Sequence, residues 1–184
     1  MKTDSKELTN LYQLAKRTAI EAGDYLFSRK DQNLIVHSDL GRDIKLEIDR
    51  ETEELIRNRL SLTGISVFGE ELGSDNIHSQ LKWIVDPLDG TSNYFRGLDQ
   101  CCVSIALMDG EEVLVGMIFN FNTNELFSAY KGGGAFLNDR HIKVSEIENK
   151  ANASLTTGFP ASEPLESSAL FLSNFRGWKK IRMF

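Results

Sequence analysis

The stretch WIVDPLDGTSN, residues 83–93, decides how we interpret this sequence. An apolar run, Trp83 to Val85, ends abruptly in Asp86, Pro87 and Asp89, and a glycine follows. Buried strands are rich in apolar residues, whereas aspartate, proline and glycine usually form turns. Two interpretations are open at this point: a surface turn, or a strand end that carries functional carboxylates.

The composition is that of an ordinary globular chain. Of 184 residues, 41% are hydrophobic and 26% are charged. The net charge of -6 argues against binding of nucleic acid polymers, because that needs a basic face. No apolar run reaches the roughly 18 residues of a membrane span, and the polar N-terminus lacks a signal-peptide core. We therefore expect a cytoplasmic protein without a membrane partner.

Apolar periodicity predicts two helices followed by a group of strands. Residues 5–29 carry an apolar stripe at helical spacing, and a second helix is expected over 50–62, after a half-buried extended segment with Ile44, Leu46 and Ile48. A short apolar strand, 65–68, ends at a pair of glutamates. Beyond Cys101 the strands are joined by short turns, which implies antiparallel pairing. The predicted class is α+β, with two helices packed on an antiparallel sheet.

The pattern changes near residue 150, which predicts a second domain. Residues 153–160 are strand-like, 163–180 have helical spacing, and the apolar IRMF at 181–184 begins another strand. We therefore assign 1–150 to an N-terminal α+β domain. Residues 151–184 are expected to be the incomplete start of a C-terminal α/β domain.

Carboxylates follow three of the apolar strand-like runs. They occur at Asp49, at Glu70 with Glu71, and at Asp86 with Asp89. Strand ends can gather in space, and Mg²⁺ prefers oxygen ligands. A glycine and a hydroxyl residue follow Asp89, and backbone N–H groups beside bound cations make a phosphate site. The combination favours a metal and phosphate site.

Each cluster also has a simpler interpretation. Asp86 and Asp89 could form a surface turn, Asp49 could cap the second helix, and the glutamates could lie in a solvated loop. Other chemistries lack their patterns: no GxSxG is present, the histidines are isolated, and Lys131 precedes the glycines instead of following them as in a P-loop. Two adjacent cysteines cannot easily form a disulfide.

Two motifs resemble the signatures of a known family. GEE at 69–71 and WIVDPLDGTSN at 83–93 are similar to those of the inositol monophosphatase family, which are Mg²⁺-dependent, lithium-sensitive phosphatases. The resemblance continues through Asp49, VSIAL, NELFSAYKGGGAFLN, IKVS and TTGFP, and so covers nearly the whole chain. It implies an αβαβα layered fold, of which this chain would hold the N-terminal half. The later GSAALDL-like segment and its metal-binding aspartate are missing, so we expect a C-terminally truncated member.

The resemblance also implies residue roles. The implied metal ligands, for two or more Mg²⁺ ions, are Glu70, Asp86, Asp89 and the Leu88 carbonyl. The implied substrate and phosphate site consists of Asp86, Leu88, Asp89, Gly90 and Thr91, with the last two donating backbone N–H groups. Asp49 and Thr91 would orient and deprotonate the attacking water, Glu70 is counted with them as catalytic, and Glu71 would support the site from behind.

The expected function is a Mg²⁺-dependent phosphomonoesterase of the inositol monophosphatase type. Its substrate would be a small sugar or polyol phosphate, hydrolysed by activated water. Three alternatives are a 3′(2′),5′-bisphosphate nucleotidase, a fructose-1,6-bisphosphatase, and a catalytically inactive fragment. A homodimer is compatible with the resemblance, because members of the family are often dimeric.

Overall fold

The computed structural model describes residues 5–30, 36–40, 43–74, 76, 78–157 and 173–183. The chain forms two compact units, 1–142 and 143–184. The assignment of 1–150 and 151–184 to two domains remains a prediction. Among the described helices, none combines the length and apolar character that crossing a membrane requires.

The first unit is built on one eight-stranded sheet. Its strands, in spatial order, are β10 (Arg140–Ile142), β9 (Gly134–Leu137), β8 (Glu125–Tyr130), β7 (Glu112–Asn120), β6 (Cys102–Asp109), β5 (Leu81–Asp89), β3 (Ser66–Gly69) and β4 (Gly73–Ser74). All neighbours are antiparallel except β3 and β5, which run parallel. The predicted α+β class is confirmed, with a mixed rather than wholly antiparallel sheet.

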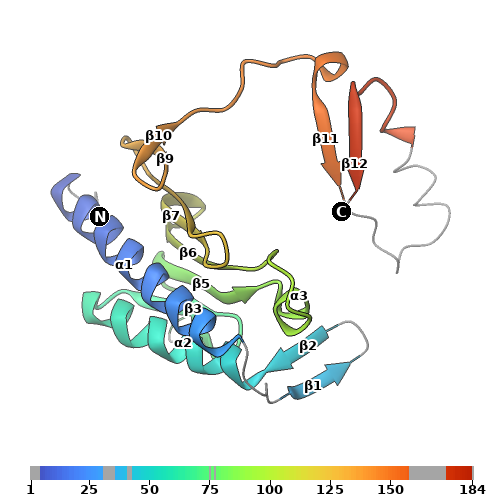
Figure 1. The fold of residues 1–184 in the computed structure, drawn as a ribbon. Helices are drawn as coiled ribbons and strands as arrows, with labels where there is room; N and C mark the ends of the chain where they lie inside the picture. The colour runs from blue at the N-terminus through green and yellow to red at the C-terminus, as the bar shows by residue number, and fades with distance from the viewer. Residues whose placement is uncertain are drawn as a thin grey trace. The chain divides into compact units, whose positions relative to one another are not determined.

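Two helices pack along one face of this sheet (Figure 1). Helix α1 spans Ser5–Arg29, as its apolar stripe predicts, and α2 spans Glu47–Leu60. Alternate strand residues meet the helices, because successive side chains on a strand point to opposite faces. The buried members of this core include Trp83, Val85, Val103, Ile105, Leu107, Val115, Met117 and Phe119. The core therefore lies between the helices and the sheet.

Helix α2 begins earlier than the sequence pattern predicts. A hairpin of β1 (Val36–Leu40) and β2 (Asp43–Leu46) precedes it, and the helix starts directly after β2. The sequence pattern extends the predicted strand to Ile48 and Asp49, but both residues lie in the first turn of α2. The predicted boundary is late because Ile48 continues the apolar alternation of the strand and is also buried as part of the helix.

The parallel pair β3 and β5 differs from the all-antiparallel prediction for a physical reason. Residues 70–80 connect the two strands, and β4 within this connection folds back antiparallel to β3. After β5, a left-handed Gly90 leads into the short helix α3, Thr91–Phe95. Parallel pairing brings the carboxyl ends of β3 and β5 to the same edge of the sheet, which matters for the site below.

The second unit contains a parallel pair of strands. β11, Ser154–Thr157, pairs with β12, Lys180–Met183, and the short 3₁₀ turn η2, Lys150–Asn152, precedes β11. The strand character predicted over 153–160 and 181–184 is confirmed for Ser154–Thr157 and up to Met183, while residues 158–160 and 184 lie outside the described residues. The helix predicted within 163–180 lies largely outside the described residues.

We predict that Gly23→Ala destabilises the protein, although alanine normally favours a helix by about 1 kcal/mol over glycine. A Cβ at Gly23 would lie 2.4 Å from Cδ1 of Phe119, so α1 would be pushed off β7. Overpacking of this kind costs about 1–3 kcal/mol. Urea denaturation followed by circular dichroism measures the change.

Gly116→Ala is the matched control, because no atom of the described residues lies within 4 Å of a Cβ placed there. We expect this control to leave the urea midpoint unchanged or slightly higher. A Gly23→Ala protein as stable as the wild type would contradict the close packing of α1 on β7.

Candidate active site

One extra residue in β5 puts Asp86 and Asp89 on the same face of the sheet. Asp86 pairs with Ser104 and Asp89 pairs with Cys102, so three steps along β5 match two steps along β6. Residues three apart in a regular strand point to opposite faces. The bulge cancels that alternation, since Ser104 and Cys102 share a face. Both carboxylates therefore point to the face of the sheet opposite α1 and α2.

The parallel pairing of β3 brings Glu70 beside Asp86. Gly69 pairs with Val85. Because the two strands are parallel, the residues that follow, Glu70 and Asp86, are also neighbours. Burial is the largest cause of the raised pKa of Asp86, and Glu70 adds to it through charge repulsion and a hydrogen bond between the two side chains. The parallel pairing therefore brings these two carboxylates together, while the convergence of the full predicted ligand set stays a prediction.

Asp49 joins the same region from the first turn of α2. Its Oδ2 accepts a hydrogen bond of 2.8 Å from the backbone N–H of Leu46, the residue at the N-cap position. In a capping box the N-cap side chain would also accept a hydrogen bond from the backbone N–H of the third helical residue. Leu46 has no side-chain oxygen, so only the bond to the Asp49 carboxylate is made. The N-cap interpretation of Asp49 is therefore wrong in position, although the side chain does serve the helix start.

The second oxygen of Asp49 is an orphan. Only 3% of Asp49 is exposed, and its Oδ1 has no hydrogen-bond partner among the described residues. An unpaired buried acceptor costs about 1–3 kcal/mol. Such an oxygen is expected to bind a proton, a water molecule or a ligand when one is supplied.

Burial and mutual repulsion raise the pKa of two of these acids. The pKa of Asp49 rises to about 7, mainly through burial, with further repulsion from Glu71, Glu70 and Asp86; the Leu46 N–H opposes the shift. The pKa of Asp86 also rises to about 7, mainly through burial and then through repulsion from Glu70 and Asp89, and the N–H of Leu88 opposes the shift. These acids are close enough to share one electrostatic environment.

The turn after β5 presents backbone and hydroxyl groups at the same point. Gly90 has a φ of 88°, and a Cβ there would lie 2.6 Å from the carbonyl oxygen of Gln100, so only glycine fits. The hydroxyl of Thr91 donates to the carbonyl of Leu88 over 3.0 Å. This bond fixes Thr91 and Leu88 next to Asp89, as expected for a turn that carries function.

The donor set fits a hard dication, although the carboxylates do not yet converge. Within the described ranges, no group of three or more His, Cys, Asp or Glu side chains is gathered tightly enough to hold a metal ion. Glu70 and Asp89 nevertheless each repel Asp86, and a divalent cation would relieve that repulsion. Carboxylate and carbonyl oxygens are the ligands that Mg²⁺ prefers. The two observations are compatible, since electrostatic repulsion acts over longer distances than metal ligation.

Cys102 borders the site but is not suited to be a nucleophile. Its Sγ lies 3.8 Å from Oδ2 of Asp89. Burial, followed by the charges of Asp89 and Asp86, raises the pKa of this thiol to about 12. A thiol reacts as the thiolate, so Cys102 stays protonated and inert near neutral pH. Both cysteines are free.

A hollow of about 250 Å³, lined by both polar and apolar side chains, opens beside Asp89. It is lined by Asp89, Gln100, Cys101, Cys102, Ile118, Asn120, Glu125 and Phe127. Sequence reasoning missed Gln100, Asn120 and Glu125, because they come from three separate strand ends or loops and share no motif. Only the sheet order, which sets β6 and β7 beside β5, brings them to this place.

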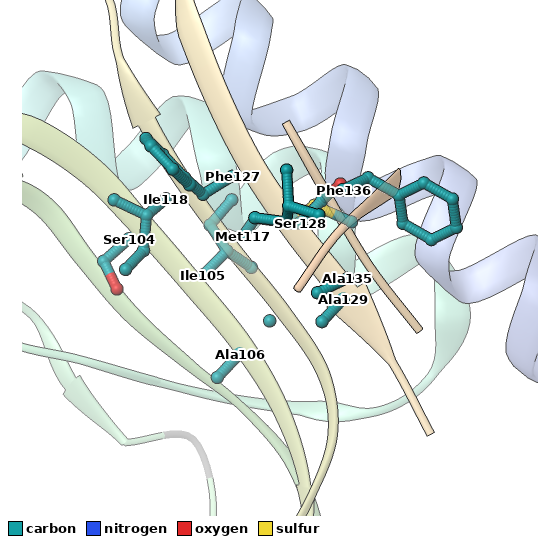
Figure 2. Close-up of a pocket in the computed structure, with 12 residues that line it drawn as sticks. Ser104, Ile105, Ala106, Met117, Ile118, Phe127, Ser128, Ala129, Ala135 and Phe136 are labelled. Carbon is teal, nitrogen blue, oxygen red and sulfur yellow. The ribbon is translucent and has the colours of Figure 1, made fainter. Parts of the chain in front are cut away.

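A second hollow, of about 340 Å³, is apolar and contains none of the predicted site residues. Figure 2 shows Ile118 and Phe127 at one end of this hollow and the small residues Ala106, Ala129 and Ala135 toward the other. Among the described residues, no carboxylate, histidine or basic side chain lines it. Its chemistry gives no reason to place a reaction there.

Comparison with known proteins assigns the chain to a protein family. The model of the inositol monophosphatase family matches residues 7–181. The chain belongs to the inositol monophosphatase family, and the resemblance found in the sequence is confirmed.

Three relatives illustrate the range of names in this family. The inositol-1-monophosphatase of Rhizobium meliloti (strain 1021) is 38% identical over 135 residues, covering 70% of this chain and 50% of that protein. The Nus factor SuhB of Xylella fastidiosa (strain Temecula1 / ATCC 700964) is 37% identical over 151 residues, covering 80% and 54%. The crystal structure of the extragenic suppressor protein suhB from Bartonella henselae has a TM-score of 0.84 and 32% identity, covering 94% and 69%. The chain thus spans about half the length of the curated relatives it matches.

We predict that chelator-treated protein loses stability as the pH rises from about 4 to about 7. Asp49 and Asp86 have folded pKa values of about 7, above the ordinary value of 3.8, so the folded state binds more protons between these values. Stability therefore falls with rising pH in that window. Urea unfolding at several pH values measures it.

The Asp86→Asn variant isolates this contribution, because asparagine cannot titrate. Its loss of stability over the same pH range should be smaller than that of the wild type. Asp109→Asn, at the far end of β6, should keep the wild-type slope. Parallel curves for the wild type and Asp86→Asn would contradict the raised pKa.

Proposed function

We propose that this protein is a Mg²⁺-dependent phosphomonoesterase that hydrolyses a small sugar or polyol phosphate. The observation that carries the proposal is the bulge in β5, which sets Asp86 and Asp89 on one face with Glu70 beside them. Family membership supports the phosphatase class. The metal, the substrate and the residue roles are our proposal.

Glu70, Asp86, Asp89 and the carbonyl of Leu88 would hold the metal. All four are oxygen donors on strand ends or on the turn that follows, so the sheet limits their movement. Bound Mg²⁺ would offset negative charge on the phosphoryl oxygens and make a coordinated water more acidic. Relief of the repulsion around Asp86 favours this binding.

Gly90 and Thr91 would bind the phosphate through their backbone N–H groups. They begin α3, where the first N–H groups of a helix have no partner within the helix. Asp86, Leu88 and Asp89 border the same place from the end of β5. The left-handed Gly90 turn brings the bare backbone to the position where an anion would approach.

Asp49 would accept the proton of the attacking water. A carboxylate with a pKa of about 7 is a stronger base near neutral pH than an ordinary aspartate. Thr91, fixed by its bond to Leu88, would orient that water, and Glu70 would act beside them. Glu71 would support these groups without binding the metal or the substrate directly.

Polar side chains in the hollow beside Asp89 support a hydroxylated substrate. Gln100, Asn120 and Glu125 line it, and among the described residues no lysine or arginine does. Hydrolysis of a 3′(2′),5′-bisphosphate nucleotide or of fructose 1,6-bisphosphate would place a second phosphate near the site, which this lining does not favour. Several relatives carry the name Nus factor SuhB, and that name specifies no substrate for these residues.

We predict that Asp89→Asn lowers Mg²⁺-dependent phosphate release by about 100-fold or more while leaving the fold intact. Loss of one ligand carboxylate removes charge stabilisation of a few kcal/mol, and about 1.4 kcal/mol corresponds to a factor of ten. Asp89 is exposed, so its replacement costs little packing. Phosphate release from a panel of polyol, sugar and nucleotide phosphates, with and without lithium, measures the activity.

Asp109→Asn serves as the control, since Asp109 lies at the opposite end of β6 from the site. Unchanged activity in Asp89→Asn would refute the site. Mg²⁺ binding by calorimetry without any phosphate release in the wild type would favour the alternative of a catalytically inactive chain.

A further inference from the structure

A fully buried carboxylate lies on α2, one turn after Asp49. Glu53 has no exposed surface, and sequence analysis gave it no role. Charged side chains are seldom buried unless they are paired. The partners of Glu53 therefore show what this position is for.

Glu53 accepts two hydrogen bonds from the turn that carries the proposed ligand Glu70. Its Oε2 accepts from the backbone N–H of Glu71 over 2.7 Å, and its Oε1 accepts from that of Leu72 over 3.2 Å. Gly69 makes this approach possible, because a Cβ there would lie 2.0 Å from Oε1 of Glu53. The carboxylate of Glu53 thus contacts the backbone both before and after Glu70.

Arg57 holds this carboxylate in place. Its Nε lies 2.8 Å from Oε1 of Glu53, one helical turn away. Its guanidinium also donates to the carbonyls of Val67, at 3.3 Å, and Gly73. One buried ion pair therefore connects α2 to β3, to the turn after it and to the start of β4.

We propose that Glu53 is a positioning residue that sets the Mg²⁺ affinity of the site by fixing the turn that carries Glu70. The inference rests on the proposed function, since it concerns the same metal. Glu53 does not reach the reacting atoms; it acts through the backbone of Glu71 and Leu72. Groups that hold metal ligands in place change metal affinity by about 10–100-fold when they are replaced.

Glutamine at this position keeps the size of the side chain but removes its charge. The amide can accept only through its one oxygen, so it cannot serve both backbone N–H groups and Arg57. The turn should then loosen while the helix and the sheet remain folded. We expect Glu53→Gln to bind Mg²⁺ about tenfold more weakly, with most of kcat recovered at saturating Mg²⁺.

The test measures Mg²⁺ binding by calorimetry together with hydrogen exchange at the amides of Glu71 and Leu72. Glu54→Gln is the matched control, because Glu54 also pairs with an arginine four residues away, Arg50, but is exposed. The control should keep wild-type affinity and exchange. If Glu53→Gln does not fold because Arg57 is left buried without its charge partner, the double variant with Arg57→Met replaces it.

Weaker Mg²⁺ binding together with faster exchange at the two amides would support the inference. Wild-type Mg²⁺ affinity in the folded variant would overturn it, and so would unchanged exchange at both amides. A wild-type protein that binds no Mg²⁺ would refute the proposed function and the metal role together. The exchange result separates the two failures, because it reports the turn without any metal.

Discussion

Two mutually repelling carboxylates, Asp86 and Asp89, are kept on one face of a sheet by a single extra residue in β5. Without that residue the strand alternation would send them to opposite faces. Every other part of the candidate site is arranged around this bulge: Glu70 arrives through the parallel pairing of β3, and the Gly90 turn leaves β5 immediately after it. The sheet holds these residues rigidly, and the bulge determines the face to which the two carboxylates point.

This arrangement weakens the fold locally and depends on the core for compensation. Burial of Asp49 and the raised pKa of Asp86 mean that charged acids stand where solvent would stabilise them better. The alternating apolar residues of β5, β6 and β7 pack against α1 and α2 a few residues away. Apolar burial of that extent can hold unfavourable groups in position, as functional sites commonly require.

The fold and the acidic clusters could be predicted because they depend on local patterns. The stripe of α1 gives its bounds, and the short turns after Cys101 give antiparallel pairing. The bulge between Asp86 and Asp89 could not be predicted, because it is defined by the register with β6 rather than by the β5 sequence. The start of α2 was placed three residues late because Ile48 suits a strand and a helix equally well. Glu53 gave no signal, since an i,i+4 Glu–Arg pair is usually exposed.

Helix α2 explains why these features occur together. Asp49, Glu53 and Arg57 are spaced four residues apart, so they lie along one face of the helix. Asp49 accepts a hydrogen bond from Leu46 at the end of β2. Glu53 accepts one from the turn after β3, and Arg57 donates to Gly73 in β4. A single helix therefore sets two separate strand ends relative to each other. An early start of α2 is needed for this, because Asp49 reaches the acidic region only from within the first helical turn, and the same rigid element then carries Glu53 to the turn beside Glu70.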